Sequence, residues 1–146
     1  MSVLSPLYPR GPVDLTQHVR ELPAGGSVPG LPEWKWIHTP GHTDGHVSLF
    51  RERDRTLIAG DAFSTTKAES VAAIATQRPE LHGPPAYYTS DWDRAKQSVE
   101  QLSILRPKTA ATGHGLPMSG AEIADALSEL ARNFDIVARP KTKRVA

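Results

Sequence analysis

Three short motifs of this sequence place a histidine or an aspartate directly after a glycine. The motifs are Thr-Pro-Gly-His-Thr-Asp-Gly-His at residues 39–46, Gly-Asp at residues 60–61 and Gly-His-Gly at residues 113–115. The side chains they present are His42, Asp61 and His114. Neutral imidazole and carboxylate groups bind zinc at roughly 2.0–2.2 Å, and ligands on three separate loops converge only if a sheet holds those loops together.

The composition narrows the class of protein. A length of 146 residues suits one domain, and 17 Lys and Arg residues against 16 Asp and Glu residues favour neither nucleic acid nor a membrane as partner. The absence of cysteine excludes disulfides, thiolate ligands and a cysteine nucleophile. No apolar run reaches the ~18 residues of a membrane span, and the first residues lack the basic-then-apolar order of a secretion signal. We therefore expect a cytoplasmic protein.

The strands that must position these motifs are predicted from alternating hydrophobicity. Residues 34–38 and 46–50 alternate over strand-like lengths on either side of the Pro-Gly-His turn, and residues 56–59 form a third apolar run. That run ends in Gly60 and Asp61, which places a carboxylate at the C-terminal edge of a strand. Six prolines among the first 33 residues leave little room for a helix, and only residues 13–22 have the composition of a strand there.

The second half of the chain predicts helices around one further strand. Residues 91–105 form an amphipathic helix that Asp91 caps and Pro107 ends, and residues 109–112 form a strand that leads into the Gly-His-Gly motif. Ser119 and Glu122 have the spacing of a capping box that opens a second helix. A short helix is predicted at residues 69–76. The domain is expected to cover residues 1–138, with a proline-rich lead-in at 1–33 and a solvated basic tail at 139–146.

A proline-rich loop at residues 82–88 contains three side chains that could line a substrate pocket. They are His82, Tyr87 and Tyr88, and simple packing of a proline-rich loop is the alternative for them. For His46 a structural role against the strand turn is favoured over metal binding, and for His38 a hydrogen-bonded role in the core is favoured.

Taken together in this order and spacing, the three motifs resemble the C-terminal half of the metallo-β-lactamase superfamily over residues 13–135. The resemblance implies an αββα sandwich, a mixed α/β fold of which this chain would form half, with zinc, manganese or iron at one edge. It implies that His42 is a metal ligand, that Asp61 is a bridging ligand with a catalytic role, and that His114 binds a second metal. A histidine satisfied within its turn is the alternative for His42, and the three roles are one hypothesis.

The resemblance also implies an activity. Metal binding lowers the pKa of water towards roughly 7, so a metal-bound hydroxide could attack an ester, thioester, lactone or amide. The pattern is similar to glyoxalase-II-like and lactonase-like hydrolases, with a small molecule as substrate. The substrate itself is not predicted, because specificity in such folds lies in loops.

This sequence departs from the family pattern before residue 38. The family's His-x-His-x-Asp-His motif is absent, and His18 is the only histidine among the first 37 residues. Each metal therefore keeps two ligands instead of the three of a usual catalytic zinc site, and this chain alone could be inactive. Half a sandwich also leaves one sheet face uncovered, which predicts a homodimer or an N-terminal half-domain as partner. A truncated hydrolase, a non-catalytic dimerising domain and a partner-binding module all stay open.

Overall fold

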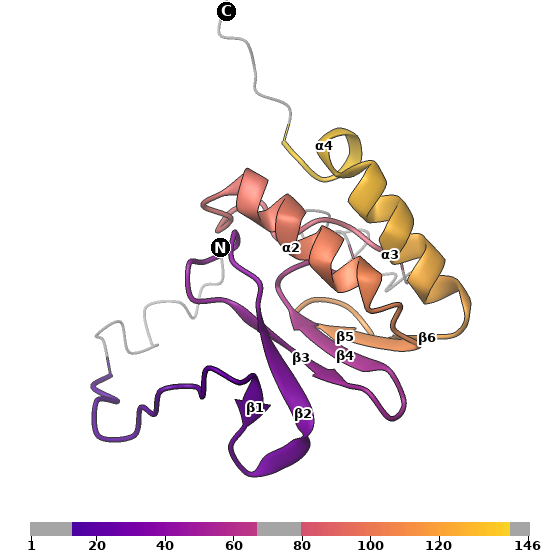
Figure 1. Cartoon of the computed structure of the whole chain (residues 1–146). Coiled ribbons are helices and arrows are strands. Elements are labelled where there is room, and N and C mark those ends of the chain that lie inside the picture. The colour runs from indigo at the N-terminus through magenta and orange to yellow at the C-terminus, as the bar shows by residue number, and fades with distance from the viewer. Residues whose placement is uncertain (1–12, 67–79, 141–146) are drawn as a thin grey trace, which may run out of the picture.

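The computed structural model of the chain describes residues 13–66 and 80–140, which form a mixed sheet with helices packed on it (Figure 1). In this part of the chain six strands lie in the order β1-β2-β3-β4-β5-β6, and only the neighbours β4 and β5 are parallel. The strands are β1 (Ser27–Val28), β2 (Leu31–His38), β3 (Val47–Arg51), β4 (Thr56–Gly60), β5 (Thr109–Thr112) and β6 (Met118–Ser119). The helices are α2 (Trp92–Ile104), α3 (Glu122–Arg132) and α4 (Phe134–Val137). The predicted mixed α/β fold is confirmed.

The strands predicted at residues 34–38, 46–50, 56–59 and 109–112 are confirmed as β2, β3, β4 and β5. The prediction of a strand at residues 13–22 is wrong. These residues are all exposed, and the backbone turns so that the N–H groups of His18 and Val19 donate to the Leu15 carbonyl at 2.8 and 3.0 Å. Among the described residues, no strand pairs with this segment to share its hydrogen bonds, and strand-like composition does not replace such a partner. The helix predicted at residues 69–76 lies outside the described residues.

Helix α2 begins as predicted, whereas the predicted start of α3 is wrong. The Asp91 carboxylate accepts from the N–H groups of Asp93 and Arg94, each at 3.0 Å, as an N-cap does. Ser119 does not cap α3. It belongs to β6, and its hydroxyl lies 3.1 Å from Thr109 Oγ1 of β5. Pairing with β5 takes Ser119 away from the helix, so α3 begins without a side-chain cap.

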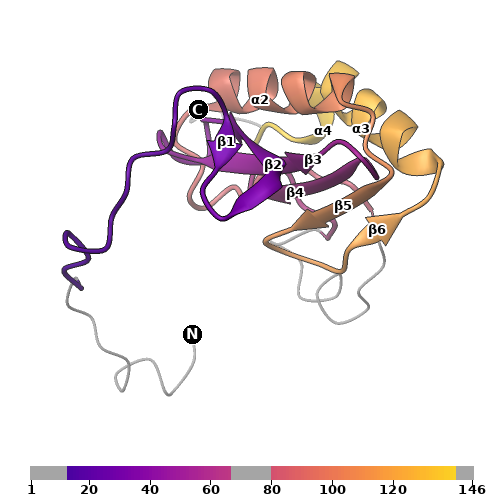
Figure 2. The same cartoon turned by 60° about the horizontal axis from the view of Figure 1, so that its bottom comes forward.

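The two faces of the sheet differ in what covers them. Helices α2, α3 and α4 all lie on one side, as Figure 2 shows. Buried side chains of the strands and helices meet there in one core, which includes Phe50, Leu57, Ala59, Ala110, Val99, Leu102, Ile123, Leu127 and Phe134.

On the other side a row of apolar side chains crosses four strands. Strand register pairs Trp36 with Leu49, Leu49 with Ile58, and Ile58 with Ala111, so these four residues share one face. None of the four is buried, and Ile58 is 40% exposed. We call this row of Trp36, Leu49, Ile58 and Ala111 the open face. No helix in the described ranges is long and apolar enough to span a membrane.

Candidate metal site

The order and direction of the strands bring the three glycine-led motifs to one edge of the sheet. Because β4 and β5 are parallel, their carboxyl ends lie side by side, and the Gly113 N–H donates to the Gly60 carbonyl at 2.9 Å. Strand β3 is antiparallel to β4, so the turn that precedes β3 and carries His42 reaches the same edge. This topology places His42, Asp61 and His114 together.

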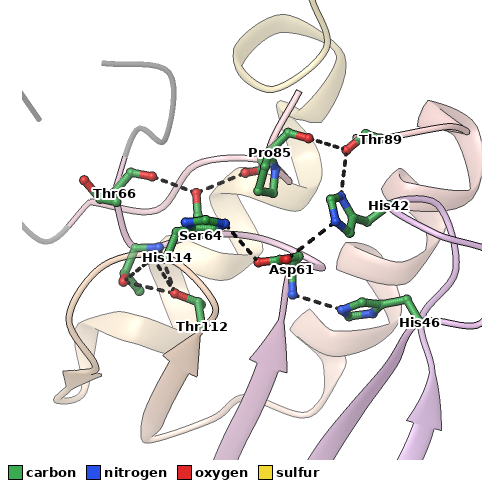
Figure 3. A network of polar contacts seen from close by, with 11 residues as sticks. His42, His46, Asp61, Ser64, Thr66, Pro85, Thr89, Thr112 and His114 are labelled. Carbon is green, nitrogen blue, oxygen red and sulfur yellow. Dashed lines mark hydrogen bonds and ion pairs between the residues drawn. The ribbon is translucent and has the colours of Figure 1, made fainter. Parts of the chain in front are cut away.

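The Asp61 carboxylate lies between the two histidines (Figure 3). Asp61 Oδ2 is 3.5 Å from His42 Nε2, and Asp61 Oδ1 is 3.7 Å from His114 Nε2. Each oxygen therefore faces a different imidazole. Two ligands that bind one zinc ion tetrahedrally at about 2.0–2.2 Å lie roughly 3.3–3.6 Å apart, so each pair is spaced nearly as two ligands of one ion are.

The donor atoms suit a cation, although they are not a complete set of ligands. Asp61 Oδ1 is buried and accepts no hydrogen bond from the described residues, which is costly for a carboxylate oxygen unless a positive charge lies beside it. Within residues 13–66 and 80–140, no group of three or more His, Cys, Asp and Glu side chains is arranged to hold a metal ion. The geometry is that of two ligand pairs that share Asp61, and a usual catalytic zinc needs a third protein ligand.

Each of the three candidate residues follows a glycine whose Cβ position is closely approached, by helix backbone at Gly41 and by side chains of the site at Gly60 and Gly113. A Cβ atom on Gly41 would lie 2.2 Å from the Ala95 backbone nitrogen, and one on Gly113 would lie 2.3 Å from Asp61 Oδ1. A Cβ atom on Gly60 would lie 2.7 Å from His46 Nε2. The glycines of the motifs therefore allow close packing around the site in addition to turning the chain.

A hydrogen bond from outside the motifs indicates which ring nitrogen of a neutral His42 carries the proton. Thr89 Oγ1 donates to the Pro85 carbonyl at 2.8 Å, so its only proton is used there. The same oxygen lies 3.3 Å from His42 Nδ1 and would accept there, which favours the tautomer with the ring proton on Nδ1. In the neutral ring, Nε2 then presents its lone pair to Asp61 Oδ2. Two acceptors at 3.5 Å repel each other unless a proton or a metal ion lies between them.

His46 and His38 lie near the site in different surroundings. His46 hydrogen-bonds through both ring nitrogens, to Thr39 and to the Asp61 backbone, which agrees with the predicted structural role. Burial lowers the pKa of His46, an effect that its hydrogen bond to the Thr39 carbonyl partly opposes. His38 is exposed, so the predicted core position is wrong, although its Nε2 atom does lie 2.8 Å from the Asp44 carbonyl oxygen.

Of the three residues predicted to bind substrate, only His82 lines the pocket described here. Tyr87 and Tyr88 are 75% and 77% exposed. His82 pairs through its backbone with Ser64 and lines a pocket of about 510 Å³ against α3, to which neither tyrosine belongs. His42, Asp61 and His114 are absent from the described lining of that pocket. Substrate binding by His82, Tyr87 and Tyr88 stays a prediction.

Sequence reasoning missed Thr89 and Thr39, which touch the site histidines. Thr89 follows the proline-rich loop, and the next two residues bind the His42 turn, since the N–H groups of Ser90 and Asp91 donate to the Gly41 carbonyl at 3.0 and 2.9 Å. An isolated threonine after a loop carries no sequence signal of such a contact. Thr39, by contrast, is the first residue of the turn motif, so its position in the sequence was a signal that it lies near the site.

Comparison with known proteins points to the same family as the three motifs do. The sequence profile of the Metallo-beta-lactamase superfamily matches residues 2–114. The chain belongs to this superfamily. The probable metallo-hydrolase YflN of Bacillus subtilis (strain 168) is 50% identical over 134 residues, which cover 92% of this chain and 51% of that protein. The probable metallo-hydrolase YqjP of the same organism is 28% identical over 108 residues, covering 74% and 31%. The chain thus spans about half the length of these relatives or less.

Solved structures share the fold. TMB-1 superposes with a TM-score of 0.54 at 18% identity, covering 83% of this chain and 53% of that one. TTHA1623 in a di-iron-bound form gives a TM-score of 0.51 at 23% identity, covering 85% and 49%. The superfamily assignment confirms the resemblance, and the superpositions again match about half of a longer chain.

Proposed function

We propose that this chain supplies His42, Asp61 and His114 to the metal site of a metal-dependent hydrolase, with Asp61 as the ligand shared between two metal ions. Zinc, manganese and iron all suit these imidazole and carboxylate donors. A small ester, thioester, lactone or amide is the proposed substrate class. The chain spans 51% of its relative YflN, so ligands from another polypeptide segment would complete the site.

The single observation that supports this proposal most strongly is the position of the Asp61 carboxylate. Its two oxygens face two different imidazole nitrogens at 3.5 and 3.7 Å, and within residues 13–66 and 80–140 no donor reaches the buried Oδ1 atom. A carboxylate in an ordinary turn would accept hydrogen bonds from backbone N–H groups or from water. Shared ligation of two cations would satisfy both of its oxygens.

The chain's own residues would orient the ligands. Thr89 keeps the proton of His42 on Nδ1, which leaves Nε2 free to bind. The backbone around His114 is also held, since Thr112 Oγ1 donates to the His114 carbonyl at 2.7 Å. A metal ion bound by these residues would polarise the substrate carbonyl and would make water a nucleophile at neutral pH.

Metal stoichiometry tests the proposal directly. The protein is loaded with zinc, manganese or iron and separated by size exclusion, and metal per chain is measured by elemental mass spectrometry for the wild type, His42→Ala and Asp61→Ala. His38→Ala is the matched control, because His38 is exposed and hydrogen-bonds to the Asp44 carbonyl outside the ligand set. We expect bound metal that His42→Ala and Asp61→Ala both lose and His38→Ala keeps. Wild-type chain without metal in every preparation would refute the proposal for this chain.

A second role is favoured by the open face. We propose that it binds a further polypeptide unit of about this chain's size, of the kind that the longer relatives carry within one chain. The apolar row from Trp36 to Ala111 supports this idea, because a sheet face rarely stays uncovered. Such a unit could also bring the missing ligands.

Light scattering and dye binding test the second role. The free chain should be monomeric and should bind a hydrophobic dye, and Ile58→Arg on the open face should reduce that binding. Thr56→Arg is the control, because Thr56 pairs with Arg51 and Thr109 in the polar row beside the open face. A stable dimer that Ile58→Arg dissociates would assign the face to a second copy of the chain instead.

A further inference from the structure

His46 ends the same turn motif that carries His42, yet both of its ring nitrogens are already occupied. Its Nε2 atom accepts a hydrogen bond from the Asp61 backbone N–H at 2.9 Å (Figure 3). Its Nδ1 atom lies 2.9 Å from Thr39 Oγ1 and 3.1 Å from the Thr39 carbonyl oxygen. The ring therefore connects the start of the turn to the backbone of the shared aspartate.

A buried chain of hydroxyl groups determines the direction of these hydrogen bonds. Ser48 Oγ donates to the Ala59 carbonyl at 3.0 Å, so it accepts from Thr39 Oγ1 at 3.0 Å. The Thr39 hydroxyl has then used its proton, and Nδ1 of His46 must be the donor to Thr39. Nε2 keeps its lone pair for the Asp61 N–H. Thr39 and Ser48 are 1% and 0% exposed, so water does not compete for these hydrogen bonds.

The backbone beside Asp61 is shaped to receive this ring. Gly60 has a φ of +57°, and a Cβ atom there would lie 2.7 Å from His46 Nε2. A larger residue at position 60 would push the imidazole away from the Asp61 N–H. In the Gly-Asp motif, Asp61 thus supplies the carboxylate, and Gly60 leaves space for the His46 ring that hydrogen-bonds to the Asp61 backbone N–H.

We propose that His46 is a positioning residue, which anchors the Asp61 amide and so keeps the two carboxylate oxygens directed at His42 and His114 without binding metal itself. The inference deepens the proposed function and rests on it. Ligand side chains must be held within about 0.5 Å of their working positions, and Asp61 stands one residue beyond the end of β4, where strand pairing no longer holds it.

The experiment combines a metal-free measurement with a metal-binding measurement. Nitrogen-15 NMR of the metal-free chain should show His46 with its proton on Nδ1, and the Asp61 amide should be protected from hydrogen exchange. His46→Leu removes the acceptor at similar volume, so amide protection should be lost and the affinity for Co²⁺ should fall by roughly 10–100-fold. His46→Gln offers an amide oxygen in its place and should restore much of both.

The possible failures are distinguishable. A proton on Nε2 of His46, or a Co²⁺ affinity that His46→Leu leaves unchanged, would overturn the inference while the proposed function stands. A wild-type chain that takes up no metal would overturn the proposed function, and the tautomer and amide-exchange results would still decide whether His46 anchors Asp61. If His46→Leu does not fold, the inference is tested by the amide protection and Co²⁺ affinity of His46→Gln and by the tautomer of His46 in the wild type.

Discussion

Gly41→Ala should destabilise the chain by about 2–5 kcal/mol, because the turn that carries His42 is pressed against the first turn of α2. A Cβ atom at position 41 would lie 2.2 Å from the backbone nitrogen of Ala95 and 2.4 Å from its Cα atom. Both are backbone atoms of a helix and cannot rotate away. Overpacking of this kind costs about 1–3 kcal/mol. Gly41 also has a φ of +130°, where a side chain costs about 1–2 kcal/mol more.

Equilibrium unfolding in urea, followed by circular dichroism, measures this loss as a lower transition midpoint at unchanged slope. Gly45→Ala is the matched control, because Gly45 lies in the same turn, has no positive φ and has no atom of the described part of the chain within 4 Å of its Cβ position. Alanine there should be neutral or should stabilise by about 0.4–1 kcal/mol. A Gly41→Ala protein as stable as Gly45→Ala would refute the reasoning, since it would mean that the turn does not pack on α2 as described.

Three further predictions concern single side chains. Thr89→Val should move the proton of the metal-free His42 ring from Nδ1 towards Nε2 in nitrogen-15 NMR, whereas Thr89→Ser should leave it in place. Hydrogen bonding by Arg51 lowers the pKa of Asp54 from 3.8 to about 2. The stability that ionised Asp54 contributes is therefore present above about pH 3.8 and is lost as the pH falls towards about 2. Asp54→Asn should reduce the dependence of unfolding free energy on pH in that window, and an unchanged dependence would contradict this. Asp91→Ala should cost about 1 kcal/mol in urea unfolding through loss of the α2 N-cap, with Asp91→Asn close to wild type.

Some elements of the fold were predictable because their cause is local. Alternating side chains in β3 and the apolar stripe of α2 arise from the periods of a strand and a helix, which the sequence displays directly. Asp91 was recognisable as a cap for the same reason, since it contacts N–H groups two and three residues away. Local patterns failed where a distant partner competed. Ser119 has the spacing of a capping box, yet it pairs with β5 instead.

In the candidate site, too, the local features were predictable from the sequence and the contacts between distant residues were not. His42, Asp61 and His114 were identified from the glycine-led motifs, because the order and spacing of those motifs are visible in the sequence. The partners of these residues were not predictable, since Thr89 is 47 residues from His42 in sequence and contacts it only in the folded chain. The direction of the His46 hydrogen bonds depends in turn on Ser48 and on the Ala59 carbonyl of the neighbouring strand.

By itself the sequence determined the superfamily, the principal strands and helices, and the identity of the three side chains that could bind metal. Only the tertiary structure decided that these side chains meet. The parallel pairing of β4 with β5 sets Asp61 beside His114, and the antiparallel pairing of β3 with β4 brings the His42 turn to them. The physical reason is that side-chain type and local period are properties of the chain, whereas the distance from each Asp61 oxygen to an imidazole depends on strand register, which forms between segments far apart in the sequence.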